Sequence, residues 1–271
     1  MFYNDVITEM LEVKSNPVNS MYLHEINIQW KNFIKAITEK NTPNERMVQA
    51  LNLFLKALSN KKFKFNPVTK NGFKEDSPLF SAIYLNDMIS VFIKRTGVTE
   101  KKGICWNYGP FSANLRFNPP NFNTMGKYPT YEQDDSAKVL QLCQKLDFQF
   151  RISGTRNFDK FQTTLPLIVF YTFKNLTEDD FTKTEYISRT AKTTFEKSRS
   201  IIVTETLAEN FVPTLKASPI DMIFILSKKF QSFGINEIST DVVDELEKKI
   251  RKYIFEKEEK NEEFKISGVI Q

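Results

Sequence analysis

An aspartate and a lysine stand at the two ends of an apolar run in the second half of the chain. Asp159 lies in "RNFDK", and the run "LPLIVFYTF" ends at Lys174, fifteen residues further on. That separation is long enough for a strand, a turn and a return strand, so we expect both side chains at neighbouring strand ends in one cleft. A carboxylate that holds a divalent metal, with an ammonium group beside it, supplies what phosphodiester hydrolysis requires.

Composition excludes several other kinds of chemistry. The chain has one histidine, His24, and two cysteines, and no Gly-x-Ser-x-Gly motif, which argues against Ser-His-Asp and Cys-His catalysis and against an ordinary zinc site. Its 8 glycines form neither a GxxxxGK[ST] nor a GxGxxG pattern, so kinase and dinucleotide-binding functions are not expected. A bound metal would therefore need oxygen ligands, which favours magnesium, manganese or calcium.

The distribution of apolar residues predicts an α/β (α+β) fold with a helical N-terminal half and a mixed sheet. We expect residues 1–100 to be mainly helical and residues 101–271 to hold a long loop, the α/β core and a C-terminal helix, possibly as one continuous domain with the first part. The segment 101–133 reads as short strands and a long structured loop. The segment "DSAKVLQLCQKL" reads as a short helix, and the chain then alternates between strands and a helix.

The order of these elements resembles the PD-(D/E)xK nuclease core of type II restriction endonucleases. The resemblance covers the run "PLIVFYTFKNLT", the helix with "EYISRTAKTTFEKSRS", and the strands "IIVTETL" and "IDMIFIL". It implies that Asp159 is the first metal-binding acid and that Lys174 orients the attacking water. A second acid, two positions before the lysine, is expected to share the metal.

This chain departs from the motif at that second position, which is Thr172. Threonine supplies no negative charge, so three alternatives stay open. Glu185 on the following helix replaces the acid and binds metal with Asp159, or Glu205 at the end of "IIVTE" reaches the cleft, or the site is inactive.

Basic and amide side chains in two segments are candidates for contacts with DNA. Arg189 and Lys192 lie three residues apart on one predicted helix face, where they can grip phosphates. The segment 101–133 offers arginine and asparagine, which read guanine and adenine in the major groove. The candidates from this segment are Asn107, Arg116, Asn118 and Lys127.

Together these patterns predict a cytoplasmic, Mg²⁺-dependent endonuclease, with Mn²⁺ as a possible substitute, that cuts double-stranded DNA at specific sequences. A net charge of +5 is compatible with this partner. Cleavage of both strands requires two sites, so we expect a homodimer or a heterodimer with a related subunit. No apolar run is long enough to span a membrane. The alternative is a catalytically inactive DNA-binding or specificity subunit on the same fold.

Overall fold

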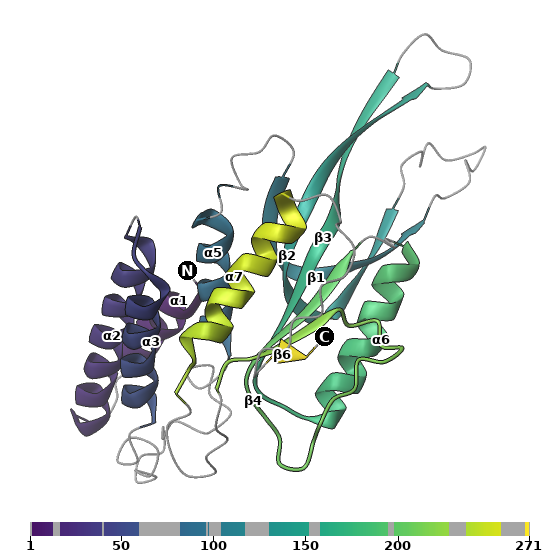
Figure 1. Ribbon diagram of the computed structural model, residues 1–271. Helices are drawn as coiled ribbons and strands as arrows, with labels where there is room; N and C mark the ends of the chain where they lie inside the picture. Colours follow the sequence, from purple (N-terminus) through teal and green to yellow (C-terminus); the bar gives the residue numbers. More distant parts are fainter. Residues whose placement is uncertain are drawn as a thin grey trace.

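The protein is an α+β structure in which helices cover both faces of a mixed sheet (Figure 1). The computed structural model describes residues 2–12, 17–39, 41–59, 82–95, 97, 104–116, 130–151, 158–194, 198–227, 237–255 and 269–270. The described sheet has six strands in the order β1-β2-β3-β4-β5-β6. The predicted fold class is confirmed.

The first part of the chain forms α1 (Phe2–Glu12), α2 (Pro17–Thr38), α3 (Asn44–Leu58) and α5 (Ile83–Arg95). Apolar residues at helical spacing turn inward, so that Tyr3, Trp30, Phe54 and Tyr84 meet as a buried aromatic cluster. The helix α5 ends near Gly97, which has φ of 71° and donates its backbone N–H to the carbonyl of Lys94.

The sheet begins as an antiparallel meander of three long strands. These are β1 (Ile104–Arg116), β2 (Thr130–Arg151) and β3 (Phe158–Leu176), and β1 and β3 pair with opposite edges of β2. The predicted helix "DSAKVLQLCQKL" is wrong, because those residues belong to β2. Val139 packs on one face of the sheet, while Leu140 and Leu142 pack on the other. Because both faces are buried here, the sequence shows no alternation of apolar and polar residues that would indicate a strand.

The strand β3 is continuous from Phe158 to Leu176. The turn that was expected between Asp159 and Lys174 does not exist, because β2 pairs with β3 from Phe150↔Asp159 to Leu140↔Phe170. Pro166 is accommodated at a register irregularity beside Cys143, a position that tolerates a residue without an N–H. Asp159 and Lys174, which were predicted at the ends of two neighbouring strands, therefore lie near opposite ends of one strand.

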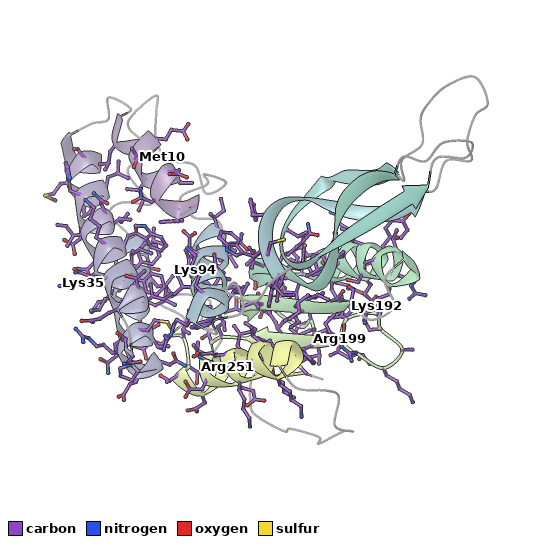
Figure 2. All side chains as sticks on the ribbon, turned by 90° about the horizontal axis from the view of Figure 1, so that it is seen from above. Met10, Lys35, Lys94, Lys192, Arg199 and Arg251 are labelled. Carbon is purple, nitrogen blue, oxygen red and sulfur yellow. The ribbon has the colours of Figure 1, made fainter. Side chains whose placement is uncertain are left out.

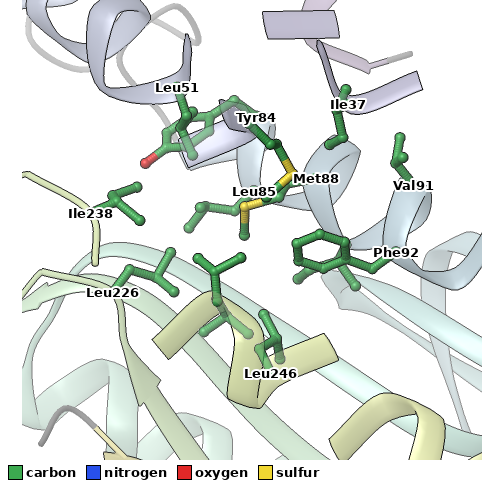
Figure 3. Close-up of a cluster of buried hydrophobic side chains, with 14 of the residues drawn as sticks. Ile37, Leu51, Tyr84, Leu85, Met88, Val91, Phe92, Leu226, Ile238 and Leu246 are labelled. Atoms are coloured by element: carbon green, nitrogen blue, oxygen red, sulfur yellow. The ribbon is translucent and has the colours of Figure 1, made fainter. Parts of the chain in front are cut away.

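After β3 the chain makes a parallel crossover through α6 (Glu178–Thr194) to β4 (Arg199–Leu207), which lies beside β3. β5 (Met222–Ile225) is parallel to β4, and β6 (Val269–Ile270) completes the edge. The helix α6 covers one sheet face, which we call the α6 face. The helices α5 and α7 (Thr240–Phe255) cover the other, the helical face, and share a buried cluster with α1, α2 and α3 (Figure 3). Within the described ranges, no helix combines the length and apolar character needed to cross a lipid bilayer.

A polar network joins the start of α3 and the end of α5 to the middle of α7. The amide of Asn44 donates to Oε2 of Glu247 (2.8 Å) and accepts from Nη1 of Arg95 (3.2 Å). Arg251 donates to Oε1 of Glu247 at 2.9 Å. Burial alone raises the pKa of Glu247, but the hydrogen bonds from Asn44 and Arg251 and the charges of Arg95 and Arg251 outweigh it, so the pKa lies below its ordinary value.

This network predicts a loss of stability in acid. Because the folded-state pKa of Glu247 is depressed, its contribution is complete above the unfolded-state pKa and is lost as pH falls through the folded-state pKa. The free energy of unfolding, measured in urea between pH 7 and pH 3, should fall less steeply in Glu247→Gln and in Asn44→Ala than in the wild type. Gln49→Ala, which removes an exposed amide from the same helix, should keep the wild-type slope. Equal slopes in all four proteins would contradict this assignment.

Candidate active site

Lys174 and Glu205 are neighbours on adjacent parallel strands. Phe173 is in register with Thr204 and Asn175 with Thr206, which places Lys174 level with Glu205. Side chains alternate along a strand, and Ile168 and Phe170 on β3 and Ile201 and Val203 on β4 pack on the helical face. Thr172, Lys174 and Glu205 continue these rows, so all three point toward the helices.

The helix α5 presents polar side chains to this part of the sheet. The hydroxyl of Thr172 donates to Oδ1 of Asn86 (3.2 Å), and the hydroxyl of Tyr84 donates to Oε1 of Glu205 (2.5 Å). Asp87 lies three residues after Tyr84, on the same side of the helix. The backbone N–H of Tyr3 donates to Oδ2 of Asp87 at 3.0 Å, so α1 also takes part.

These polar groups are buried beside the aromatic cluster. Asp87 is 2% exposed, Asn86 4% and Glu205 5%. Burial, and then the charge and hydrogen bond of Glu205, raise the pKa of Tyr84 well above its ordinary value of 10.0. Burial and the charge of Glu205 also raise the pKa of Tyr3, which indicates that its phenol lies near the same carboxylate. Both phenols therefore remain protonated at neutral pH.

Among sequence-predicted residues, the structure brings Thr172, Lys174 and Glu205 together. It does not bring Asp159 to them, since Asp159 lies fifteen residues before Lys174 on the same strand, a span of about 50 Å at the usual rise of a β-strand. In that part of the sheet, β2 residues 145–151 and β3 residues 158–164 pair with each other, beyond the residues that pair with β1 and β4. The prediction that Asp159 and Lys174 share a cleft is therefore wrong.

Glu185 is also separated from this group. In α6, Phe181 and Ala191 pack on the α6 face, and Ser188 donates a hydrogen bond to the hydroxyl of Tyr171 (3.3 Å) on that same face. The sheet therefore lies between α6 and the row of Thr172 and Lys174. Of the two residues considered as replacements for the missing acid, Glu205 lies level with Lys174, whereas Glu185 lies on a helix across the sheet.

Sequence reasoning missed the residues of α5 and the start of β2. Asn86 and Asp87 interrupt the apolar pattern of "IYLNDMISVFI", and such a polar pair inside a buried helix is the signal that identifies them. Asp134 and Asp135 precede the apolar run of β2.

The backbone at this point of β2 is irregular. Pro110 of β1 pairs with Lys138 and the next residue, Phe111, pairs with Asp134, which leaves residues 135–137 without partners on β1. Bulges of this type often occur beside active sites, where they redirect a side chain. Asp134 therefore lies beside Phe111 of β1, at the edge of this irregular segment.

The donor atoms of this group are oxygens. Among the residues that the structure describes, no cluster of three or more His, Cys, Asp and Glu side chains could hold a metal ion. Magnesium, however, commonly uses only one or two protein carboxylates and completes its shell with water and substrate phosphate. Asp87, Glu205 and the oxygens of Thr172 and Asn86 fit such a hard cation, and they do not fit the nitrogen and sulfur preference of zinc.

Lys192 takes part in an ion pair within the protein. Its ammonium group binds Oδ2 of Asp221 at 2.7 Å, and Nη1 of Arg199 binds Oδ1 of the same carboxylate at 3.0 Å. Figure 2 labels Lys192 on α6 and Arg199 at the start of β4. Asp221 also accepts the backbone N–H of Ser200 at 2.7 Å, so it fastens α6 to the starts of β4 and β5. Lys192 thus has a structural contact, Arg189 is exposed on α6, and the role of both residues in DNA binding stays a prediction.

The other expected DNA contacts are placed in part. The backbone of Asn107 pairs with Gln141, and that of Arg116 pairs with Thr130 at the end of β1. Asn118 and Lys127 lie outside the described residues. Their roles stay predictions.

Comparison with solved structures reveals a likeness in fold. The chain is similar to a chain of the native BbvCI A2B2 tetramer, a type II restriction endonuclease, with a TM-score of 0.58 and 14% sequence identity. The match covers 93% of this chain and 96% of the other. No protein-family model and no curated protein matches the sequence. At this identity the likeness concerns the fold alone, which the two chains share over nearly their whole length.

The position of Lys192 predicts a stability effect. Asp221→Asn removes a charge that Lys192 and Arg199 share in a partly buried site, and hydrogen bonds to charged groups are worth about 1.5–3 kcal/mol. We expect the free energy of unfolding in urea to fall by about that amount. Glu209→Gln, an exposed change just after β4, should alter it by less than about 0.5 kcal/mol. A loss at Asp221 no larger than at Glu209 would show that this ion pair does not hold α6 to the sheet.

Proposed function

We propose that this protein is a divalent-metal-dependent endodeoxyribonuclease of the restriction type, with its active site where β3 and β4 end beneath α5. The observation that carries the proposal is the juxtaposition of Lys174 and Glu205 on one face of the sheet. A lysine and a carboxylate on neighbouring strands, under a helix with buried polar groups, are uncommon in a core unless they serve chemistry. The restriction-enzyme fold supports the same conclusion.

In this proposal Glu205 takes the place of the acid that Thr172 does not supply. Thr172 instead donates its hydroxyl to Asn86, which fixes α5 against β3. For the first acid of the motif we propose Asp134 or Asp135 at the start of β2, and not Asp159. Asp134 lies beside the irregular pairing of β1 and β2, whereas Asp159 lies fifteen residues before Lys174 on β3.

Lys174 supplies positive charge at the scissile phosphate. Its ammonium group would orient the attacking water and offset the negative charge that develops on the phosphoryl oxygens. Thr206 holds the backbone at this point, since its hydroxyl lies 3.3 Å from the carbonyl of Lys174 and 3.0 Å from Oδ1 of Asn175. Bound Mg²⁺, or Mn²⁺, would polarise the phosphate and acidify the water.

The proposed substrate is double-stranded DNA, and a single site cuts one strand. We therefore propose that two active sites act together in a homodimer or in a heterodimer with a related subunit. The A2B2 tetramer of BbvCI is a precedent for assembly by a protein of this fold.

A second candidate function is a specificity subunit that binds DNA and does not cut it. The observation that favours it is Thr172 itself, whose hydroxyl is engaged by Asn86 at the position where the motif has an acid. Such a subunit would show the steep salt dependence of phosphate contacts without cleavage.

The nuclease proposal predicts cleavage of plasmid DNA with Mg²⁺ that depends on the two facing residues. Lys174→Ala and Glu205→Gln should each lower the single-turnover rate by about 10²–10³-fold, because each removes a charge used in the transition state. Lys183→Ala and Glu185→Gln are the matched controls, since both residues lie on α6 across the sheet, and these variants should cut at the wild-type rate.

The same experiment separates the candidates. Loss of cleavage in Glu185→Gln with Glu205→Gln fully active would overturn the site assignment. If no variant and no wild-type preparation cuts DNA with Mg²⁺ or Mn²⁺, while binding remains salt-dependent, the specificity subunit is the better description.

A further inference from the structure

Tyr84 contacts the proposed catalytic carboxylate directly from the opposite layer of the molecule. Its hydroxyl donates to Oε1 of Glu205 at 2.5 Å, and the two residues are 121 positions apart in sequence. Tyr84 is 1% exposed and Glu205 5%. A carboxylate buried to this extent requires donors, because an unsatisfied buried charge costs several kcal/mol.

The position of the Tyr84 hydroxyl is fixed by its ring. The ring packs against Phe54, with centroids 5.8 Å apart, and against Tyr3, with centroids 6.4 Å apart. Figure 3 shows the same ring beside Leu51 within the buried cluster. The helix α5 is held at two further positions close to Tyr84. Asn86 contacts Thr172, and Asp87 accepts the backbone N–H of Tyr3. A rigid phenol therefore meets a glutamate that has three rotatable side-chain bonds.

We propose that Tyr84 is a positioning residue for Glu205, and that the aromatic cluster of the N-terminal helices sets the orientation of the catalytic carboxylate. Tyr84 touches neither substrate nor metal in this role and acts through Glu205. Its hydroxyl engages one carboxylate oxygen and so fixes the plane of the group and the direction of the other oxygen. The inference rests on the proposed function, because it assumes that Glu205 belongs to the active site.

The chemistry of the phenol suits this role. A phenol hydroxyl can donate one hydrogen bond, and an ionised carboxylate only accepts, so the two groups are complementary. Hydrogen bonds that orient a metal-binding carboxylate change metal affinity or activity by about 10–100-fold when they are removed.

The test compares two tyrosine-to-phenylalanine variants. Tyr84→Phe removes the hydroxyl and keeps the packed ring. The matched control is Tyr253→Phe, because that hydroxyl also contacts a buried side chain, Sδ of Met222 at 3.4 Å, but on α7 and away from Glu205. Circular dichroism and urea unfolding establish that each variant is folded. Mn²⁺ affinity is measured without DNA by the paramagnetic resonance signal of the free ion, and Mg²⁺-dependent cleavage is measured in single turnover.

We expect Tyr84→Phe to weaken Mn²⁺ binding and to lower the cleavage rate, each by about 10–100-fold. DNA affinity in EDTA should stay within about twofold, and Tyr253→Phe should match the wild type in every assay. In a Glu205→Gln background, Tyr84→Phe should cause no further loss of Mn²⁺ affinity, because a residue that acts through Glu205 has nothing left to position.

The outcomes distinguish this inference from the proposed function. If the wild type cuts DNA and Glu205→Gln does not, but Tyr84→Phe matches Tyr253→Phe in cleavage and Mn²⁺ affinity, the inference is overturned and the nuclease stands. An additive effect of Tyr84→Phe in the Glu205→Gln background overturns it as well. If the wild type binds Mn²⁺ through Glu205 and Tyr84→Phe weakens that binding without any cleavage, the positioning role stands and the nuclease does not. A wild type that neither binds Mn²⁺ nor cuts DNA overturns both.

Discussion

Burial of the Glu205 carboxylate is the constraint on which the arrangement of the two halves depends. A charged group on the inner face of a sheet is tolerated only where donors surround it, and the hydroxyl of Tyr84 is supplied from a helix more than a hundred residues away in sequence. That contact fixes α5 over β4, and the bond between Thr172 and Asn86 fixes the same helix over β3. Two polar contacts thus hold the helix across the two strands that carry the proposed chemistry.

Part of this site could be read from the sequence. Lys174 follows the apolar run of β3, and Glu205 ends the run of β4, so both strand ends carry a charged residue that stands out. Asp159 was misleading because strand length is not encoded by local composition. Only pairing with β2 makes residues 158–176 one strand, and without that partner the polar stretch "FQTT" resembles a turn. Glu185 was misleading because the face of the sheet that a crossover helix covers is a property of the assembled fold.

The helices were predicted better than the strands for a physical reason. In α3, Met47, Leu51, Phe54 and Leu58 repeat at the helical period and all of them are buried, so one amphipathic face determines the element. In β2, the residues of "VLQLC" are buried on both sides of the sheet, and a run of that kind has no period of its own. Because this segment was predicted to be a helix, Asp134 and Asp135 were not predicted as site residues at the start of a strand. Asn86 and Asp87 were not predicted as site residues because the apolar residues around them are typical of a helix in a hydrophobic core.

The cluster of buried residues that includes Tyr3, Trp30 and Phe54 also includes Leu140, Phe170, Val203 and Leu246. The N-terminal helices are thus one wall of the same interior that the sheet encloses. A recombinant fragment that began near residue 100 would leave an apolar sheet surface uncovered, together with a carboxylate deprived of its phenol. Material of that kind collects in inclusion bodies, so the two sequence halves would have to be produced as a single polypeptide or coexpressed.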